Sequence, residues 1–259
     1  MTTQNKQARS DVRNKKIEKS YGSNYLKWKE WNNNTFFGNL NKQDKAYYSA
    51  ELRRTKKSFP KNSKILEIGF GNGSFLKFAK EKNWKIYGTE VNKNLVKKAI
   101  ECGYNVTHTD NLLSYKDNTF DLVVAFDVME HIPQDEVLNF ISQVKRTLKK
   151  DGFFIARVPN GDSPFGLVNQ NGDITHLTTI GSGKIFYFAA LSNMEVIFVG
   201  EEAQPLIGTS LLFLGHRLIA LPIKKILNLI TRLIFFPRSN IAFYSLNLTM
   251  IYRKSKPSK

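Results

Sequence analysis

The sequence predicts an α/β fold in which helices cover both faces of a mainly parallel sheet. Three observations lead to this prediction. Short apolar runs alternate with amphipathic segments of helical length through the middle of the chain. Several of these runs end on an acidic residue, and the first is followed by a glycine-rich turn. Hydrophobic residues make up 41% of the 259, which is enough for one packed domain with additions.

The first strand and the turn that follows it lie within residues 64–80. The strand residues Ile65, Leu66 and Ile68 suit burial on both faces of a sheet. Three alternate glycines follow, Gly69, Gly71 and Gly73. Glycine lets the chain turn sharply and lets a ligand approach the backbone closely, so a nucleotide-like ligand is expected. A dinucleotide fingerprint needs a further glycine where this chain has Ser74, which weakens an NAD assignment.

Three further strands are predicted at residues 85–91, 105–110 and 120–132. Because ligands of doubly wound sheets bind at the carboxyl ends of the strands, four acids are expected around one crevice. They are Glu67, Glu90, Asp110 and Asp127. A carboxylate after the second strand can accept both hydroxyls of a ribose, and one after the third can accept an adenine amino group.

The order and spacing of these motifs resemble the class I S-adenosylmethionine-dependent methyltransferases over residues 64–158. The resemblance implies a Rossmann-like sheet of seven strands, with S-adenosylmethionine as the cofactor and with Glu90 and Asp110 on its ribose and adenine. The cofactor-binding residues that it implies are Glu67, Gly69, Gly71, Gly73, Glu90, Val91, Asp110, Asn111, Phe126 and Asp127.

The rest of the chain completes this fold. A helix at 135–150 covers the sheet, and strands five, six and seven are predicted at 153–160, 193–202 and 243–254. The long stretch 161–183 has no periodicity and is expected to be a functional loop on the crevice side.

The chain is predicted to divide at residues 60/61. Residues 1–60 are a basic, aromatic extension with a disordered start, and residues 61–259 are the methyltransferase domain. Aromatic and lysine residues alternate through 21–37, where we expect a helical lid over cofactor or substrate. The alternative is that these aromatic residues pack the extension onto the sheet.

The loop after strand five carries the candidate chemistry. Its sequence, RVPNGDSPFG followed by GDITHLTTIGSGKI, is similar to a methyltransferase branch found with cell-surface polysaccharide genes. The similarity implies O-methylation of a saccharide or lipid-linked saccharide. A sugar hydroxyl needs a general base; His176, with Asp173 to orient it, is the first candidate, and His131 is the second. Asn160 and Asp162 are candidate acceptor ligands.

A helical, apolar and basic insertion is predicted at 204–240, between strands six and seven. Its longest uncharged run is shorter than the roughly 20 residues that span a bilayer. As one helix, residues 217–232 would carry a narrow basic stripe and a wide apolar face, and Pro222 is expected to split it in two. We expect this insertion to attach in the plane of an anionic membrane. Packing on the core or on a second subunit is the alternative.

The net charge of +17 favours an anionic partner but does not choose among nucleic acid, lipid head groups and phosphorylated substrates. RNA methylation, methylation of a lipophilic molecule such as a quinone, and non-catalytic cofactor binding are therefore alternatives, although no RNA-binding module is visible. No cysteine and histidine spacing predicts a metal. The start lacks a secretory apolar core, and Cys102 is the single cysteine, so a cytoplasmic protein is expected, peripheral at the inner membrane face if the insertion attaches there.

Overall fold

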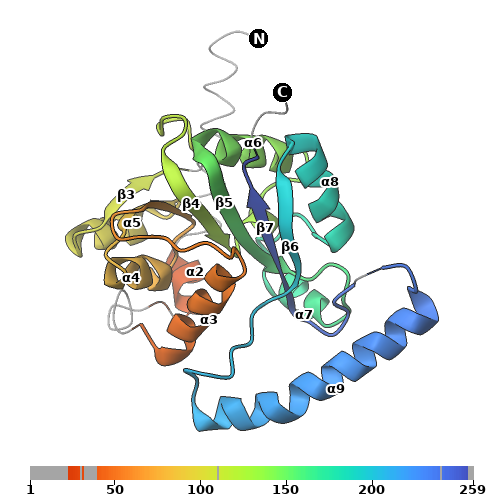
Figure 1. Ribbon diagram of the computed structural model, residues 1–259. Helices are drawn as coiled ribbons and strands as arrows, with labels where there is room; N and C mark the ends of the chain where they lie inside the picture. The colour runs from red at the N-terminus through yellow and green to blue at the C-terminus, as the bar shows by residue number, and fades with distance from the viewer. Residues whose placement is uncertain (1–22, 30, 32–39, 110, 240, 256–259) are drawn as a thin grey trace.

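The computed structural model describes residues 23–29, 31, 40–109, 111–239 and 241–255. In this part of the chain, helices cover both faces of a seven-stranded sheet, and one long helix lies outside these layers (Figure 1). The elements are α2 (Ser23–Trp28), α3 (Lys42–Arg53), β1 (Lys64–Ile68), α4 (Ser74–Glu81), β2 (Lys85–Glu90), α5 (Lys93–Glu101), β3 (Asn105–His108), β4 (Phe120–Phe126), η1 (Met129–His131), α6 (Val137–Thr147), β5 (Leu148–Pro159), α7 (Gly166–Gly172), α8 (Ser182–Ser192), β6 (Glu195–Glu201), α9 (Leu211–Phe235) and β7 (Asn247–Arg253). The predicted disordered start and part of the predicted lid, 1–22 and 32–39, lie outside the described residues.

The strand order is β3-β2-β1-β4-β5-β7-β6. Strands β1 to β5 pair in parallel, and β7 is antiparallel to both β5 and β6. The chain runs outward from β1 to β3 and then returns to start β4 on the other side of β1, so the order reverses between β1 and β4. Such a switch point is where a doubly wound sheet binds its ligand. The predicted seven-stranded α/β fold is confirmed.

Successive residues of the central strands enter opposite halves of the core. Ile65 of β1 and Leu122 of β4 pack with α3 and α4, whereas Leu66 and Val123 pack with α6 and α8. All four side chains are fully buried. Both faces of these strands are covered, which explains why their sequence is a continuous apolar run rather than an alternation.

The prediction of one irregular stretch over residues 161–183 is partly wrong. The segment contains α7 and the start of α8. Helix α7 has only seven residues, too few for a helical period to stand out in the sequence. At Gly166 a β-carbon would lie 2.1 Å from the carbonyl oxygen of Asn160, so the turn into α7 needs glycine.

The predicted break at Pro222 is also wrong, because α9 runs through it as one helix of 25 residues. A proline removes one backbone N–H and crowds the carbonyl of the residue four positions earlier, here Leu218. Leu218 and Pro222 are both exposed, so water can serve the carbonyl that loses its partner. Among the described helices, α9 included, none combines the length and the apolar character that crossing a bilayer requires.

Candidate functional site

The glycine turn after β1 lies beside the carboxylate that ends β2. Gly69, Gly71 and Gly73 all have positive φ angles, of +65°, +50° and +75°. The Glu90 carboxylate accepts three backbone N–H groups, those of Gly71 (3.1 Å), Val91 (2.8 Å) and Asn92 (3.0 Å). Burial raises the pKa of Glu90, and these three hydrogen bonds oppose the shift. Glu90 therefore joins the turn after β1 to the turn after β2.

Glu67, in β1, is a second buried carboxylate at this turn. Its Oε2 is buried and has no hydrogen-bond partner in the structure. Burial, and then the charge of Glu90, raise the pKa of Glu67 well above its usual range. Two buried carboxylates, one of which has an oxygen without a hydrogen-bond partner, favour a ligand that carries positive charge.

The other predicted cofactor residues fall into three groups. Asp110 lies outside the described residues, and its neighbour Asn111 is exposed and accepts the Leu113 N–H. Phe126 is half-buried among aromatic rings. Asp127 has a positive φ of 56° and forms an ion pair with Arg157, whose Nε donates to it at 2.8 Å. The ion pair leaves Asp127 already engaged at the end of β4.

The structure brings His176 close to a buried glutamate that the sequence places 46 positions earlier. His176 Nδ1 lies 3.0 Å from the carbonyl oxygen of Gln170, so it carries the proton and donates. In the neutral ring Nε2 then has a lone pair, and it lies 3.9 Å from both Glu130 Oε1 and Asp173 Oδ2. Glu130 is fully buried with both carboxyl oxygens unpartnered, and burial, followed by the charge of Asp127, raises its pKa well above the usual range.

His131, the second candidate base, packs edge-on against His176 with ring centroids 4.6 Å apart. Its Nδ1 lies 3.0 Å from Thr175 Oγ1, which donates to Asp173 Oδ1. Burial, and then the charge of His176, lower the pKa of His131 to about 4, so this ring is neutral at pH 7. Asp173 therefore orients His131 through Thr175, whereas the carbonyl of Gln170 orients His176.

The described part of the N-terminal extension contacts both the Asp173 side chain and the glycine turn. Lys29 Nζ lies 3.2 Å from Asp173 Oδ2, and the Tyr25 hydroxyl donates to the same oxygen at 3.3 Å. Burial alone would raise the pKa of Asp173, but the hydrogen bonds from Thr175 and Lys29 outweigh it and lower the pKa to about 2. Trp31 packs on the glycine turn, so closely that a β-carbon on Gly71 would lie 2.8 Å from its ring.

The two candidate acceptor ligands have structural partners. Asn160 is fully buried; its amide donates to the carbonyls of Ala242 and Ser245 and its oxygen accepts the Asp162 N–H. Asp162 accepts the Ser182 N–H at 2.7 Å and so caps the start of α8. In this structure both side chains hold the loop after β5 in place.

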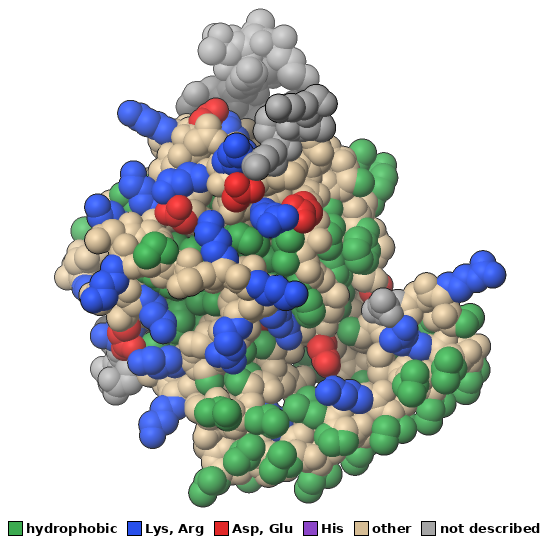
Figure 2. Space-filling view, viewed as in Figure 1, with side chains coloured by type: hydrophobic (Ala, Val, Ile, Leu, Met, Phe, Trp, Pro, Cys, Tyr) green, Lys and Arg blue, Asp and Glu red, His purple; other side chains and the backbone are tan. Residues whose placement is uncertain are grey.

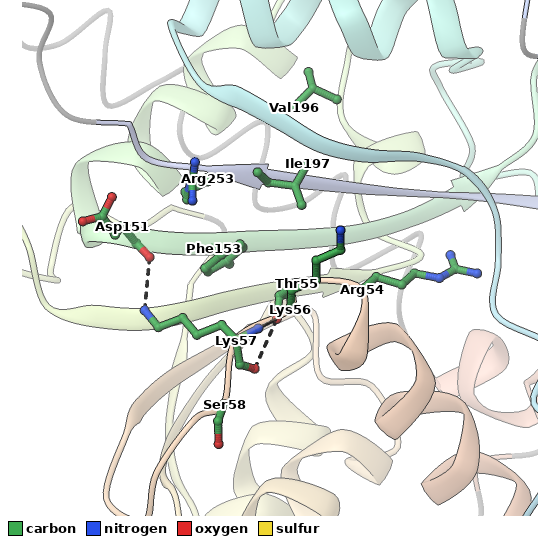
Figure 3. Close-up of a pocket in the computed structure, with 10 residues that line it drawn as sticks. All are labelled: Arg54, Thr55, Lys56, Lys57, Ser58, Asp151, Phe153, Val196, Ile197 and Arg253. Atoms are coloured by element: carbon green, nitrogen blue, oxygen red, sulfur yellow. Dashed lines mark hydrogen bonds between the residues drawn. The ribbon is translucent and has the colours of Figure 1, made fainter.

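A basic hollow of about 720 Å³ lies elsewhere, at the amino-terminal edge of the sheet (Figure 3). Its lining includes Lys57, whose Nζ donates to the carbonyl of Asp151 at 3.1 Å, and Arg253 at the end of the antiparallel β7. The glycine turn follows the carboxyl end of β1, so the hollow is not part of the switch-point site.

The profile of a family described as a methyltransferase domain matches residues 40–192. The chain belongs to this family. An uncharacterised protein of Methanocaldococcus jannaschii is 37% identical over 103 residues, which are 38% of this chain and 42% of that protein. The mitochondrial arginine-hydroxylase NDUFAF5 of Mus musculus is 28% identical over 106 residues, 39% of this chain and 30% of that protein. The chain thus matches less than half the length of either relative.

A solved structure with a similar fold is a SAM-dependent methyltransferase from Archaeoglobus fulgidus. It has a TM-score of 0.59 and 22% sequence identity, and the match covers 85% of this chain and 97% of that one. This likeness supports the methyltransferase fold over nearly the whole of that protein.

S-adenosylmethionine, the cofactor that the sequence resemblance implies, fits the residues present. S-adenosylmethionine has a positively charged sulfonium, and the glycine turn offers two buried carboxylates, Glu67 and Glu90, with one unpartnered oxygen. Gly71 has a positive φ and no side chain, so a ligand can approach its backbone when the Trp31 ring moves aside. In this methyltransferase domain, Glu67, Glu90 and the glycines would hold the cofactor.

No local pattern in the sequence points to Glu130, Thr175 or Lys29 as parts of the site. Glu130 stands next to His131 in the chain, but its burial without a partner is a tertiary property that no local pattern signals. Glu130, His131 and His176 also bring one possible metal-ligand atom each within 4.8 Å of one another. Cysteine and histidine spacing could not indicate this grouping, because its parts come from η1 and from the stretch before α8. The expectation of no metal stays a prediction.

Proposed function

We propose that this protein transfers a methyl group from S-adenosylmethionine to a hydroxyl of a saccharide or lipid-linked saccharide used in cell-envelope polysaccharide biosynthesis. The observation that carries the proposal is His176: its Nδ1 proton is held by the Gln170 carbonyl, so Nε2 can take a proton. A hydroxyl acceptor needs such a base, whereas a more nucleophilic amine needs it less. The saccharide part rests on the similarity of residues 157–166 and 172–185 to enzymes of that branch.

When bound, the cofactor supplies an electrophilic methyl group on its sulfonium. In our proposal His176 Nε2 accepts the hydroxyl proton, and the resulting imidazolium lies beside the Asp173 carboxylate. Neutral His131 packs against the same ring and limits its rotation. Tyr25, Lys29 and Trp31 cover the site and exclude water, which an in-line displacement between aligned groups requires.

Three alternatives follow from specific observations. The net charge of +17 favours RNA as the acceptor. The exposed apolar side chains of α9 favour a lipophilic acceptor such as a quinone. The name of the relative NDUFAF5, an arginine-hydroxylase, is a reason to test whether methyl transfer occurs at all.

The deciding experiment supplies methyl-labelled S-adenosylmethionine with separate pools of envelope glycolipid, total RNA and extracted quinones. Label in the glycolipid pool supports the proposal. Label in RNA or in the quinones assigns the acceptor to that alternative, and binding of the cofactor without label in any pool favours a non-catalytic role.

His176→Ala tests the proposed base directly. We expect turnover to fall by about 10²-fold or more, with unchanged cofactor affinity, because Nε2 has no contact with the glycine turn. His216→Ala, on the exposed surface of α9, is the matched control and should keep full turnover. Equal turnover by the His176 variant and the control would remove His176 from the mechanism.

A further inference from the structure

Helix α9 is amphipathic, but its polar side faces the protein. Asn228 Oδ1 accepts the Phe243 N–H at 2.8 Å, and Thr231 Oγ1 shares a hydrogen bond with the Tyr244 hydroxyl at 3.0 Å. One turn further on, Arg232 Nε donates to the Ser239 carbonyl at 2.8 Å, and near the helix start Arg217 donates to the Pro205 carbonyl. A surface helix of a soluble domain normally turns its apolar face inward, so α9 has the opposite arrangement.

The apolar side of α9 consequently faces solvent. None of its 25 residues is buried, and its exposed large apolar side chains are Leu211, Leu212, Phe213, Leu218, Ile219, Ile223, Ile226, Leu227, Leu229, Ile230, Leu233, Ile234 and Phe235. The exposed fractions of Leu211, Ile219 and Phe235 are 85%, 68% and 69%. Figure 2 shows these apolar side chains as a continuous band along the outer edge of the helix. Contiguous apolar surface of this extent marks a binding face.

We propose that the outer face of α9 docks this protein on the surface of an anionic lipid bilayer, with the helix lying in the plane of the membrane. An in-plane helix buries an apolar face at the boundary between head groups and acyl chains, and cations beside it attract anionic lipids. Lys225 on the helix and Arg238 just after it are exposed, and residues 203–240 contain five lysines and arginines and no acid. The charge around the apolar band is thus complementary to an anionic surface.

A second copy of the chain suits this face less well. Each copy carries a formal net charge of +17, so pairing two outer faces brings like charges together, whereas an anionic bilayer neutralises them. The lysine stems near the band are long enough to keep their ammonium groups at the head groups while the apolar side chains go deeper.

Docking through α9 would place the candidate site near the membrane. The segment after α9 ties the helix to the carboxyl end of β5: Ala242 and Ser245 accept hydrogen bonds from Asn160, and Phe243 is bonded to Asn228 of the helix. This is the edge of the sheet that carries the glycine turn, as the position of α9 in Figure 1 also indicates. Docking is measured without turnover, so it does not depend on the identity of the acceptor.

The test is sedimentation of the full chain with vesicles of phosphatidylcholine alone and of phosphatidylcholine with phosphatidylglycerol. We expect binding to the anionic vesicles that weakens as salt rises. The combined variant Ile219→Ser, Ile226→Ser and Ile230→Ser should lower the vesicle partition coefficient at least 10-fold, because all three side chains face outward. The matched control is Ile100→Ser, Phe186→Ser and Leu191→Ser, three similarly exposed apolar residues away from α9, and it should bind as the parent does.

The charge part has its own variant, Lys224→Gln, Lys225→Gln and Arg238→Gln, which should weaken binding to the anionic vesicles and flatten its salt dependence. Equal binding by the parent and the α9 serine variant would overturn the proposal, as would no binding to anionic vesicles. Light scattering of the parent in solution supplies the other outcome: a dimer that the α9 serine variant abolishes would assign the face to a second copy instead.

Discussion

Glu130→Gln tests whether the buried carboxyl beside His176 is neutral in the folded protein. Glutamine has nearly the same shape as a protonated glutamate, and like it stays polar and buried. The substitution therefore changes one property above all, the ability to lose a proton. Glu130 is fully buried with both oxygens unpartnered, and burial raises its pKa well above the ordinary value of 4.5.

The sign and size of the effect follow from proton linkage. Above pH 4.5 the unfolded chain gives up this proton while the folded chain keeps it, so the free energy of unfolding falls as pH rises. The fall is about 1.4 kcal/mol for each pH unit, until the raised pKa of the folded state is passed. The glutamine variant has no such loss, so its stability relative to the parent should be constant below pH 4.5 and should rise above it. For a chain of this size, each pH unit corresponds to about 4 °C in Tm.

The assay is thermal and urea unfolding of parent and variant from about pH 4 to pH 8, without cofactor. EDTA is present, because a cation bound by Glu130, His131 and His176 would hold the carboxylate ionised. Glu101→Gln, at the exposed end of α5, is the matched control for the effect of a glutamate-to-glutamine substitution itself. A pH-independent difference for Glu130→Gln would refute the conclusion that Glu130 is neutral.

Two further predictions concern the cofactor half of the site. Glu90→Ala should raise the Kd for S-adenosylmethionine at least 10-fold by calorimetry, because its carboxylate holds the N–H groups of Gly71, Val91 and Asn92; an unchanged Kd would mean that these bonds do not shape the binding turn. Gly71→Ala should lower the free energy of unfolding by about 1–2 kcal/mol through its positive φ alone, and more through contact with Trp31. In a Trp31→Ala background, Gly71→Ala should cost less free energy of unfolding, because the contact with the ring is gone and only the cost of the positive φ remains. If the effects of the two substitutions instead add fully, the ring does not press on the turn.

Much of the fold could be predicted because the deciding signals are local. Ile65 and Leu66 lie in an apolar run too short for a helix, and the glycines after them allow φ angles that other residues avoid. Glu67 and Glu90 could be placed at one crevice because parallel strands end at the same edge of a sheet. These inferences need only the order of strands along the chain.

The candidate catalytic cluster needed information that the chain order does not contain. His131 and His176 were predicted separately, with Asp173 as the partner of His176, but their rings pack against each other and Asp173 reaches His131 through Thr175. The reason is the path of the loop before α8, whose residues Leu177 and Thr178 donate to the backbone carbonyl of Glu130. These two hydrogen bonds fix the loop on η1, and no sequence period reports them.

For α9 the sequence pattern predicted a helix with two unlike sides, but it did not indicate which side faces the protein. The arc that contains Arg217, Asn228 and Arg232 follows from a rotation of about 100° per residue, yet this periodicity indicates only that the two sides of the helix differ. Asn228 accepts the Phe243 N–H and Arg232 donates to the Ser239 carbonyl, and these hydrogen bonds with the segment before β7 decide that this arc faces the protein. Because the polar side of α9 is hydrogen-bonded to the rest of the protein, its apolar side is exposed and is free to contact another partner.

Residues 29 and 31 of the N-terminal extension contact two parts of the site, the catalytic cluster around Asp173 and the glycine turn. Trp31 contacts the glycine turn, and Lys29, two residues earlier, pairs with Asp173 beside His176. A ligand that displaces the Trp31 ring acts two residues from Lys29, and loss of the Lys29 ammonium removes one of the interactions that keep Asp173 ionised. We therefore expect cofactor binding to be coupled to the charge beside the proposed base. The substitution Lys29→Met tests this coupling. It should change the affinity for S-adenosylmethionine, although Lys29 has no contact with the glycine turn in this structure.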